Sequence, residues 1–229
     1  MLHFKKSILL FLISTFQSML GLSQDWPNLN KYREDNEKVG LPSFDEKRIV
    51  FMGNSITEGW KHIYPEFFEG KPYINRGIGG QTTPQMLVRF RQDVIHLKPT
   101  VVVILAGVND IAGNTGPSSL EMIMDNIKSM CEIAQANGIK VILSSILPAY
   151  EFSWKPEINP IEPIEKLNTL IKNYANQQGF VYLDYYSAMV DERKGLQKQF
   201  SDDEVHPNLI GYKAMAPLCE EAIAKALDK

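Results

Sequence analysis

The chain has 229 residues, of which 44% are hydrophobic and 22% are charged, and its formal net charge is −3. This length suits one domain of α/β size, and the composition is that of a folded globular protein, which excludes an intrinsically disordered chain. The mildly acidic sequence has no basic run, so nucleic acids and anionic membranes are poor candidate partners.

The first 23 residues are typical of a secretory signal peptide. Lys5 and Lys6 precede an apolar run over residues 8–13, and Ser23 then leads into a polar segment. The strongly apolar part is shorter than the roughly 20 residues that a membrane-spanning helix needs. We therefore expect cleavage near Ser23 and export to the periplasm or the cell exterior, and not a membrane anchor. Loss of residues 1–23 removes two lysines and no acidic residue, which changes the net charge from −3 to −5.

Residues 24–47 form a polar and aromatic N-terminal arm, with one short helix expected around residues 29–38. Short apolar runs then alternate with segments of helical periodicity. The apolar runs predict strands over residues 48–52, 72–75, 100–106, 140–147 and 180–183.

Helical periodicity and end signals predict the connecting helices. We expect helices over residues 83–96 and 160–178. A capping box of Ser118 and Glu121 starts a further long helix, which stops at Gly138. The last helix begins near residues 207–208, and Pro217 should kink it.

Strands that alternate with helices predict a parallel sheet with helices on both faces. Five strands in the flavodoxin-like order 2-1-3-4-5 give a three-layer α/β/α domain over residues 48–229. In that order the carboxyl ends of the first and third strands meet at the switch point where such folds bind ligands. A long loop at residues 149–163, rich in proline and aromatic residues, follows the fourth strand at the same edge.

Ser55 in GNSIT follows the first strand, at the point where a helix is expected to begin. Taken alone, this serine is most simply explained as a helix N-cap. The alternative is a nucleophile, because free N–H groups at a helix N-terminus can stabilise a developing oxyanion. A serine nucleophile also needs a base.

His206 in SDDEVHPN is the best candidate for that base. Asp203 lies three residues earlier, so its carboxylate can reach Nδ1 of the ring within one turn and leave Nε2 free to accept a proton. Taken alone, a surface Asp/His pair that caps the last helix is the simpler explanation. Gly80, after the second strand, and Asn109, after the third, are candidate hydrogen-bond donors. Taken alone, Gly80 can be explained by a tight turn, and an Asx turn is the favoured explanation of Asn109.

Together these segments form a more specific pattern. Loops after the first three strands and before the last helix lie at one sheet edge and supply a nucleophile, two donors and a base with its orienting acid. Those are the groups that acyl transfer requires. Among all residues, no HxxxH, cysteine cluster or acidic cluster has metal-ligand spacing, so we expect no metal and no organic cofactor.

The four segments resemble the blocks of the SGNH family, also called GDSL-type hydrolases, in the family's order. GNSIT places the nucleophile on Ser55, and NRGIGGQTT places a backbone oxyanion donor on Gly80. AGVND places an amide donor on Asn109, and DEVHPN places the acid and base on Asp203 and His206. The resemblance implies the SGNH hydrolase fold and an oxyanion hole made of the N–H groups of Ser55 and Gly80 and the Asn109 amide.

The sequence departs from the family pattern at residues 54 and 81, where Asn and Gln stand in place of the commoner Asp. The second departure is expected to alter the loop beside Gly80. GNSITEGW and HPNLIGY are similar to platelet-activating-factor acetylhydrolase-like and carbohydrate acetylesterase-like members. This implies an exported serine esterase that removes short acyl groups, chiefly acetyl, from small-molecule or glycan esters. The alternatives are a lysophospholipase or thioesterase and, from another class, a non-catalytic glycan-binding protein on the same fold.

The loop after the fourth strand is the candidate substrate wall. Tyr150, Phe152 and Trp154 could stack on a sugar or line an acyl pocket, although a loop folded onto its own aromatic residues is an equal alternative. The sequence leaves open whether Cys131 and Cys219 form a disulfide, and it does not indicate the oligomeric state.

Overall fold

Five parallel strands form one sheet in the order β2-β1-β3-β4-β5. The computed structural model describes residues 25–229. The strands are β1 (Ile49–Gly53), β2 (Tyr73–Gly77), β3 (Val101–Leu105), β4 (Lys140–Ser144) and β5 (Val181–Leu183). The predicted parallel sheet and its strand order are confirmed, whereas the signal-peptide prediction for residues 1–23 lies outside the described residues.

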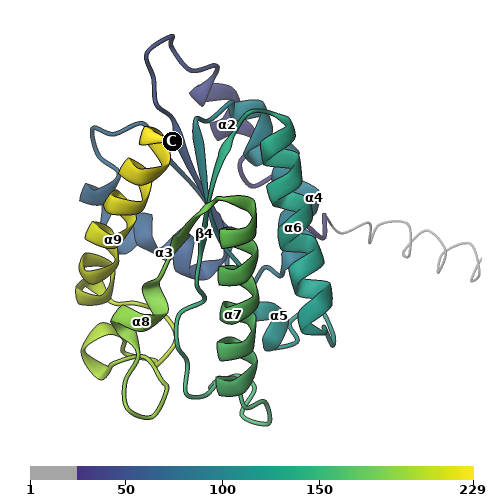
Figure 1. Cartoon of the computed structure of the whole chain (residues 1–229), viewed down its shortest axis with the longest axis vertical. Helices are drawn as coiled ribbons and strands as arrows, with labels where there is room; N and C mark the ends of the chain where they lie inside the picture. The colour runs from purple at the N-terminus through teal and green to yellow at the C-terminus, as the bar shows by residue number, and fades with distance from the viewer. Residues whose placement is uncertain (1–24) are drawn as a thin grey trace, which may run out of the picture.

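Helices cover both faces of the sheet (Figure 1). The helices α3 (Ser55–Ile63) and α9 (Leu209–Asp228) pack on one face. The other face is covered by α4 (Thr83–Asp93), α6 (Leu120–Ala136) and α7 (Ile161–Gln178). The shorter elements are α2 (Arg33–Val39), α5 (Val108–Ile111), α8 (Tyr185–Met189), η1 (Pro65–Phe67), η2 (Ile95–Leu97) and η3 (Lys198–Phe200).

The strands are buried because both of their faces are covered. Every residue of β1 and β3 is buried, as expected of central strands in a parallel sheet. The carboxyl ends of the strands point toward the lower end of Figure 1, where α5 and α8 follow β3 and β5. This edge therefore receives the loops that carry the predicted site residues.

Three local predictions need correction. The N-cap of α6 is Ser119, whose hydroxyl accepts the N–H of Met122, and not Ser118. The short helices α5 and α8 were not expected, because four or five residues are too few to show a helical period. The predicted helix over residues 83–96 ends at Asp93 and continues as a separate 3-10 turn.

Cys131 and Cys219 are both buried and free. They lie on α6 and α9, which pack on opposite faces of the sheet. The sheet therefore separates the two thiols, and the open question of a disulfide between them is answered. Among residues 25–229, no helix combines the length and the apolar character needed to cross a membrane.

Candidate active site

Ser55 is the first residue of α3, directly after the turn that leaves β1. The N-cap is Asn54, whose side chain accepts the N–H of Ile56 at 3.1 Å. The explanation of Ser55 as a cap is therefore wrong, and its hydroxyl is available for another partner. Gly53 allows the turn to be tight, because a Cβ at this position would lie 1.9 Å from Oγ1 of Thr57.

The partner of the Ser55 hydroxyl is the ring of His206. Ser55 Oγ lies 2.9 Å from His206 Nε2, across 151 positions of sequence. On the other side of the ring, His206 Nδ1 lies 2.7 Å from Oδ2 of Asp203. A hydroxyl, an imidazole and a carboxylate in this order can activate the hydroxyl as a nucleophile and stabilise the imidazolium that forms.

The orientation of Asp203 is fixed within its own turn. Its Oδ1 accepts the backbone N–H groups of Val205 at 2.9 Å and of His206 at 2.7 Å. Glu204, between Asp203 and Val205, has a left-handed backbone (φ 65°), which closes the turn. Partial burial raises the pKa of Asp203, but hydrogen bonds from His206 and Val205 outweigh that effect and lower the pKa to about 2. The carboxylate is therefore ionised at neutral pH.

The loop between β2 and α4 carries the candidate donor Gly80 past Ser55. Gly80 has a left-handed backbone (φ 73°), and the Asn114 amide donates to its carbonyl oxygen at 3.1 Å. Asn109 is buried at the start of α5 and donates to the carbonyl oxygen of Gln81 at 2.9 Å. One N–H of the Asn109 amide is thus used to hold this loop, and the other remains for a ligand.

Buried polar side chains that the sequence did not single out support this loop. Arg89 on α4 is fully buried and donates to the Gln81 side chain at 2.5 Å and to the carbonyl oxygen of Gly53 at 2.9 Å. It therefore joins the loop to the strand end that precedes Ser55. The same guanidinium pairs with Asp93 at 3.0 Å. The Gln81 side chain, at the position where the sequence departs from the family pattern, thus accepts a hydrogen bond from a buried arginine.

Asp110 holds the other end of the same loop. Its carboxylate accepts both the N–H (3.0 Å) and the hydroxyl (2.6 Å) of Thr83, the first residue of α4. Burial raises the pKa of Asp110, and the hydrogen bonds from Thr83 oppose that shift. The sequence signal was its position directly after Asn109, in the loop that follows the strand predicted over residues 100–106.

The predicted substrate wall is only partly exposed. Trp154 is 41% exposed, and its ring stacks on the His206 ring with centroids 6.3 Å apart. Tyr150 is also 41% exposed, and the Arg193 guanidinium lies over its ring. Phe152 is fully buried and stacks beneath Trp154 at 5.1 Å. The prediction that Phe152 faces the substrate is therefore wrong, because its side chain supports Trp154 from below.

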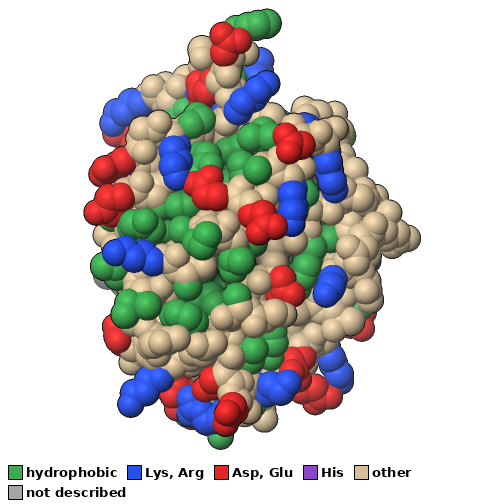
Figure 2. All heavy atoms as spheres, turned by 60° about the vertical axis from the view of Figure 1, so that its left-hand side comes forward, with side chains coloured by type: hydrophobic (Ala, Val, Ile, Leu, Met, Phe, Trp, Pro, Cys, Tyr) green, Lys and Arg blue, Asp and Glu red, His purple; other side chains and the backbone are tan. Residues whose placement is uncertain are grey.

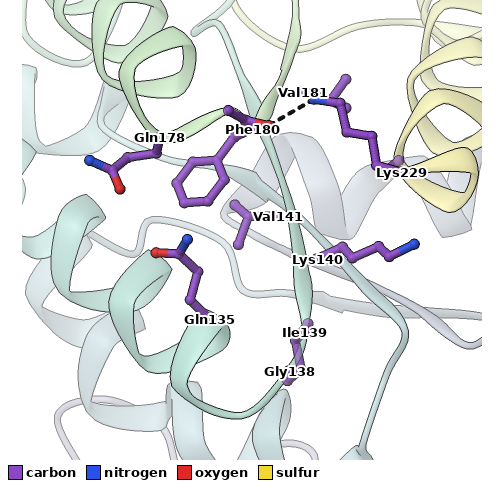
Figure 3. A pocket seen from close by; sticks show the side chains of 11 residues that line it. Gln135, Gly138, Ile139, Lys140, Val141, Gln178, Phe180, Val181 and Lys229 are labelled. Atoms are coloured by element: carbon purple, nitrogen blue, oxygen red, sulfur yellow. Dashed lines mark hydrogen bonds between the residues drawn. The ribbon is translucent and has the colours of Figure 1, made fainter.

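Two hollows can be compared as candidate sites. One, of about 610 Å³, lies beside His206 and Asp203 and is bordered by Ile63, Leu209 and Ile210. The other, of about 340 Å³, lies at the amino ends of β4 and β5 and is shown in Figure 3. Its lining contains lysine and glutamine side chains but no serine, histidine or carboxylate. Acyl transfer therefore cannot be built there. The candidate site is the group of Ser55, His206 and Asp203, which the first hollow borders through His206 and Asp203.

Within the described part of the chain, no three histidine, cysteine, aspartate or glutamate side chains are grouped as metal ligands would be. The reactive groups at the carboxyl ends of the strands are instead the hydrogen-bonded pairs Ser55–His206 and His206–Asp203.

Comparisons with known proteins identify the family of the chain. Residues 51–214 match the model of the GDSL-like lipase/acylhydrolase family. An acetylxylan esterase of Xylanibacter ruminicola is 27% identical over 82% of this chain, and this chain spans only 45% of that relative. Esterase TesA of Pseudomonas aeruginosa is 29% identical, with 69% of this chain and 74% of that protein covered. The crystal structure of a GDSL-like lipase from Bacteroides thetaiotaomicron superposes with a TM-score of 0.86 at 48% identity, over 88% of this chain and 100% of that one.

Proposed function

Since this chain belongs to the GDSL-like lipase/acylhydrolase family, we propose that it is a serine esterase that cleaves short-chain acyl esters, chiefly acetyl esters of carbohydrates. The observation that carries the proposal is the continuous hydrogen-bonded chain from Ser55 Oγ through the His206 ring to Asp203. We propose Ser55, His206 and Asp203 as the catalytic triad, with Gly80 and Asn109 as hydrogen-bond donors to the oxyanion.

The reaction begins when Ser55 Oγ attacks the ester carbonyl carbon and His206 Nε2 takes the hydroxyl proton. The carbonyl oxygen becomes an oxyanion, which the N–H groups of Ser55 and Gly80 and the second Asn109 N–H stabilise. When the tetrahedral intermediate collapses, the bond to the alcohol oxygen breaks and His206 returns the proton to that oxygen. Water, deprotonated by His206, then attacks the acyl-enzyme and releases the carboxylic acid and free Ser55.

Two features support an acetylated carbohydrate as the substrate. Trp154 and Tyr150 are partly exposed aromatic side chains in the loop that stacks on the catalytic histidine, where the departing alcohol must lie to be protonated. Aromatic rings offer an apolar body with a polar rim, which suits a sugar. The similar acetylxylan esterase bears the name of an enzyme that acts on such an ester.

We also propose export, which follows from the basic and apolar segment at residues 1–23. The test is the mass of the protein recovered from the periplasm or the medium after expression with its full sequence. Recovery of the uncleaved chain in the cytoplasm alone contradicts export.

Hydrolysis of lipid esters is the second candidate, and one surface feature favours it. Ile63, Leu209 and Ile210 are 43%, 42% and 57% exposed around the hollow beside His206. On the face that carries α3 and α9, Figure 2 shows hydrophobic side chains that gather between charged ones. A p-nitrophenyl ester series from acetyl to octanoyl separates the two candidates. We expect the highest kcat/KM for acetyl, and a maximum at octanoyl favours the lipid-directed enzyme.

The proposal is tested most directly by Ser55→Ala. Loss of the nucleophile should lower kcat for p-nitrophenyl acetate, and acetate release from acetylated glycans, by at least about 10⁴-fold. The circular dichroism spectrum should stay unchanged, because the hydroxyl does not cap α3. Ser129→Ala is the matched control, since Ser129 is a partly exposed serine on α6 whose hydroxyl donates to the carbonyl oxygen of Asp125 within its own helix. Turnover retained by Ser55→Ala contradicts the assignment.

A further inference from the structure

The N-terminal arm lies against the loop that carries Gly80. The carbonyl oxygens of Trp26 and Pro27 accept the side-chain amides of Gln85 and Gln81, both at 2.7 Å. The Tyr32 hydroxyl donates to the carbonyl oxygen of Gly77, where β2 ends. The family match begins at residue 51, so these arm contacts lie outside the matched region. The arm therefore adds contacts of its own to one side of the active site.

One arm residue, Lys31, is linked to this loop through the side chain of Glu58 on α3. The Lys31 ammonium pairs with Oε1 of Glu58, which lies one turn after Ser55 on α3. The other carboxylate oxygen of Glu58, Oε2, accepts the N–H of Gly79 at 2.6 Å. A single carboxylate thus connects the arm, the helix of Ser55 and the residue before Gly80.

The two backbones approach each other closely at this point. A Cβ at Gly77 would lie 2.1 Å from the Glu58 nitrogen, so α3 and the end of β2 are in direct contact. A Cβ at Gly79 would lie 3.0 Å from Oε2 of Glu58 and 3.9 Å from Cβ of Ser55. Gly79 is therefore bordered by both the carboxylate and the serine.

A carboxylate in this place has two opposite effects on ester hydrolysis. Its hydrogen bond to Gly79 fixes the peptide that leads to the Gly80 N–H. Its negative charge, however, disfavours a second negative charge on the oxyanion. Oε2 of Glu58 and Cβ of Ser55 lie 3.0 Å and 3.9 Å from the Gly79 position, each within the screening length of about 8 Å at physiological ionic strength, so salt only partly screens the carboxylate from a charge that forms next to Ser55. A cation paired with the carboxylate removes most of this repulsion.

We propose that Lys31 and Glu58 are positioning residues of the active site. Glu58 holds the Gly79 peptide so that the Gly80 N–H faces the oxyanion, and Lys31 neutralises the charge that this arrangement brings near the oxyanion. The inference rests on the proposed esterase function, and it makes part of the N-terminal arm a component of the catalytic apparatus.

A double-mutant cycle tests whether Lys31 compensates the charge of Glu58, with kcat and KM measured for p-nitrophenyl acetate. Lys31→Met leaves the Glu58 charge uncompensated and should lower kcat about tenfold, with KM within about twofold of the parent, because the oxyanion forms only after binding. Glu58→Gln keeps an oxygen that accepts the Gly79 N–H, and kcat should stay within about threefold. The double variant, Lys31→Met with Glu58→Gln, has no charge to compensate and should recover kcat to within about threefold of the parent.

The control for a lost ion pair between distant segments is Lys71→Met. Lys71 lies just before β2 begins, at the amino ends of the strands and so opposite the active site, and it pairs with Glu220 at 2.5 Å. The kcat of Lys71→Met should equal that of the parent. Thermal unfolding of each variant shows that it is folded.

The inference is overturned if Lys31→Met has the parental kcat, or if the double variant is as slow as Lys31→Met, which would indicate a structural role alone. Either result leaves Ser55→Ala inactive and the esterase proposal standing. Retained activity of Ser55→Ala would instead remove the esterase proposal itself.

Discussion

The side of the site that carries Ser55 is held by buried groups from several elements, whereas the side that carries His206 is held by its own turn. Arg89 and Asp110 are buried, and they join the β2–α4 loop to the end of β1 and to α5. Asp203 and His206 lie three positions apart, and their side chains are 50% and 39% exposed.

This difference separates folding from chemistry. The buried side cannot lose a polar group without leaving its partners unsatisfied inside the protein, so its geometry is tied to the stability of the fold. The exposed side can exchange hydrogen bonds with water, so its geometry matters for proton transfer and little for folding. Variants on the two sides should therefore fail in different ways.

The strongest way to sharpen this comparison is Asp203→Asn. The asparagine oxygen can still accept the N–H groups of Val205 and His206. Its amide group then faces His206 Nδ1 as a donor, which places the ring proton on Nε2 and leaves no acceptor for the Ser55 proton. We expect kcat to fall about 10³- to 10⁴-fold while the free energy of unfolding changes by less than about 1 kcal/mol.

The neighbouring Asp202→Asn is the control, because Asp202 is exposed beside the same hollow and touches neither Ser55 nor the His206 ring in a hydrogen bond. Its kcat for p-nitrophenyl acetate should stay within about twofold of the parent. An Asp203→Asn enzyme that keeps more than a tenth of the parental kcat contradicts the role of Asp203.

The buried side should show the opposite behaviour in Arg89→Met. This change removes four hydrogen bonds and leaves Asp93, whose side chain is 1% exposed, as a buried carboxylate without its ion pair, hydrogen-bonded only to the Asn36 amide. Such a loss costs about 3–5 kcal/mol of unfolding free energy. Urea unfolding measures it.

The exposed pair Lys225–Glu221 has the same i,i+4 spacing at 2.6 Å, with both side chains 62% exposed. Lys225→Met should therefore change the unfolding free energy by no more than about 0.5 kcal/mol. Equal losses for Arg89→Met and Lys225→Met would show that burial does not distinguish the two sides.

The sheet could be predicted from the sequence because its central strands are uninterrupted apolar runs between turn residues. Strand ends were less clear. β2 continues through Arg76 to Gly77, two residues beyond the end predicted at residue 75. Arg76 is 3% exposed, and the carbonyl oxygen of Asn75 and the side chain of Asn36 accept hydrogen bonds from two of its nitrogens, Nη1 and Nε. Such tertiary partners cannot be read from a local pattern.

The sequence predicted which residues form the site, but it did not predict most of the side chains that hold them in place. Ser55 and His206 were placed by motif, and the structure brings them within hydrogen-bonding distance. Arg89 and Glu58 were missed because a charged residue on an amphipathic helix is normally solvated. A signal did exist for Arg89: it lies three residues after Met86 and next to Phe90, on the face of the helix that the apolar residues define as buried.

The smallest expected effect is a pair of opposite pH dependences. The pKa of Asp203 is lowered to about 2 from an unfolded value of about 3.9, so its stabilisation is complete above about pH 4 and is lost as the pH falls through about 2. Because the group is half exposed, we expect at most about 1 kcal/mol, or a few degrees in thermal midpoint.

Burial raises the pKa of Asp110, so the contribution of Asp110 to stability has the opposite pH dependence. This contribution is complete below the unfolded pKa and falls as the pH rises through the higher, folded pKa. Thermal midpoints of the parent, Asp203→Asn and Asp110→Asn between pH 2.5 and pH 7 test both slopes. The gap between the parent and Asp203→Asn should close toward low pH, and the parent should lose stability relative to Asp110→Asn as the pH rises. Slopes of the same sign would mean that burial does not set the difference between the two sides.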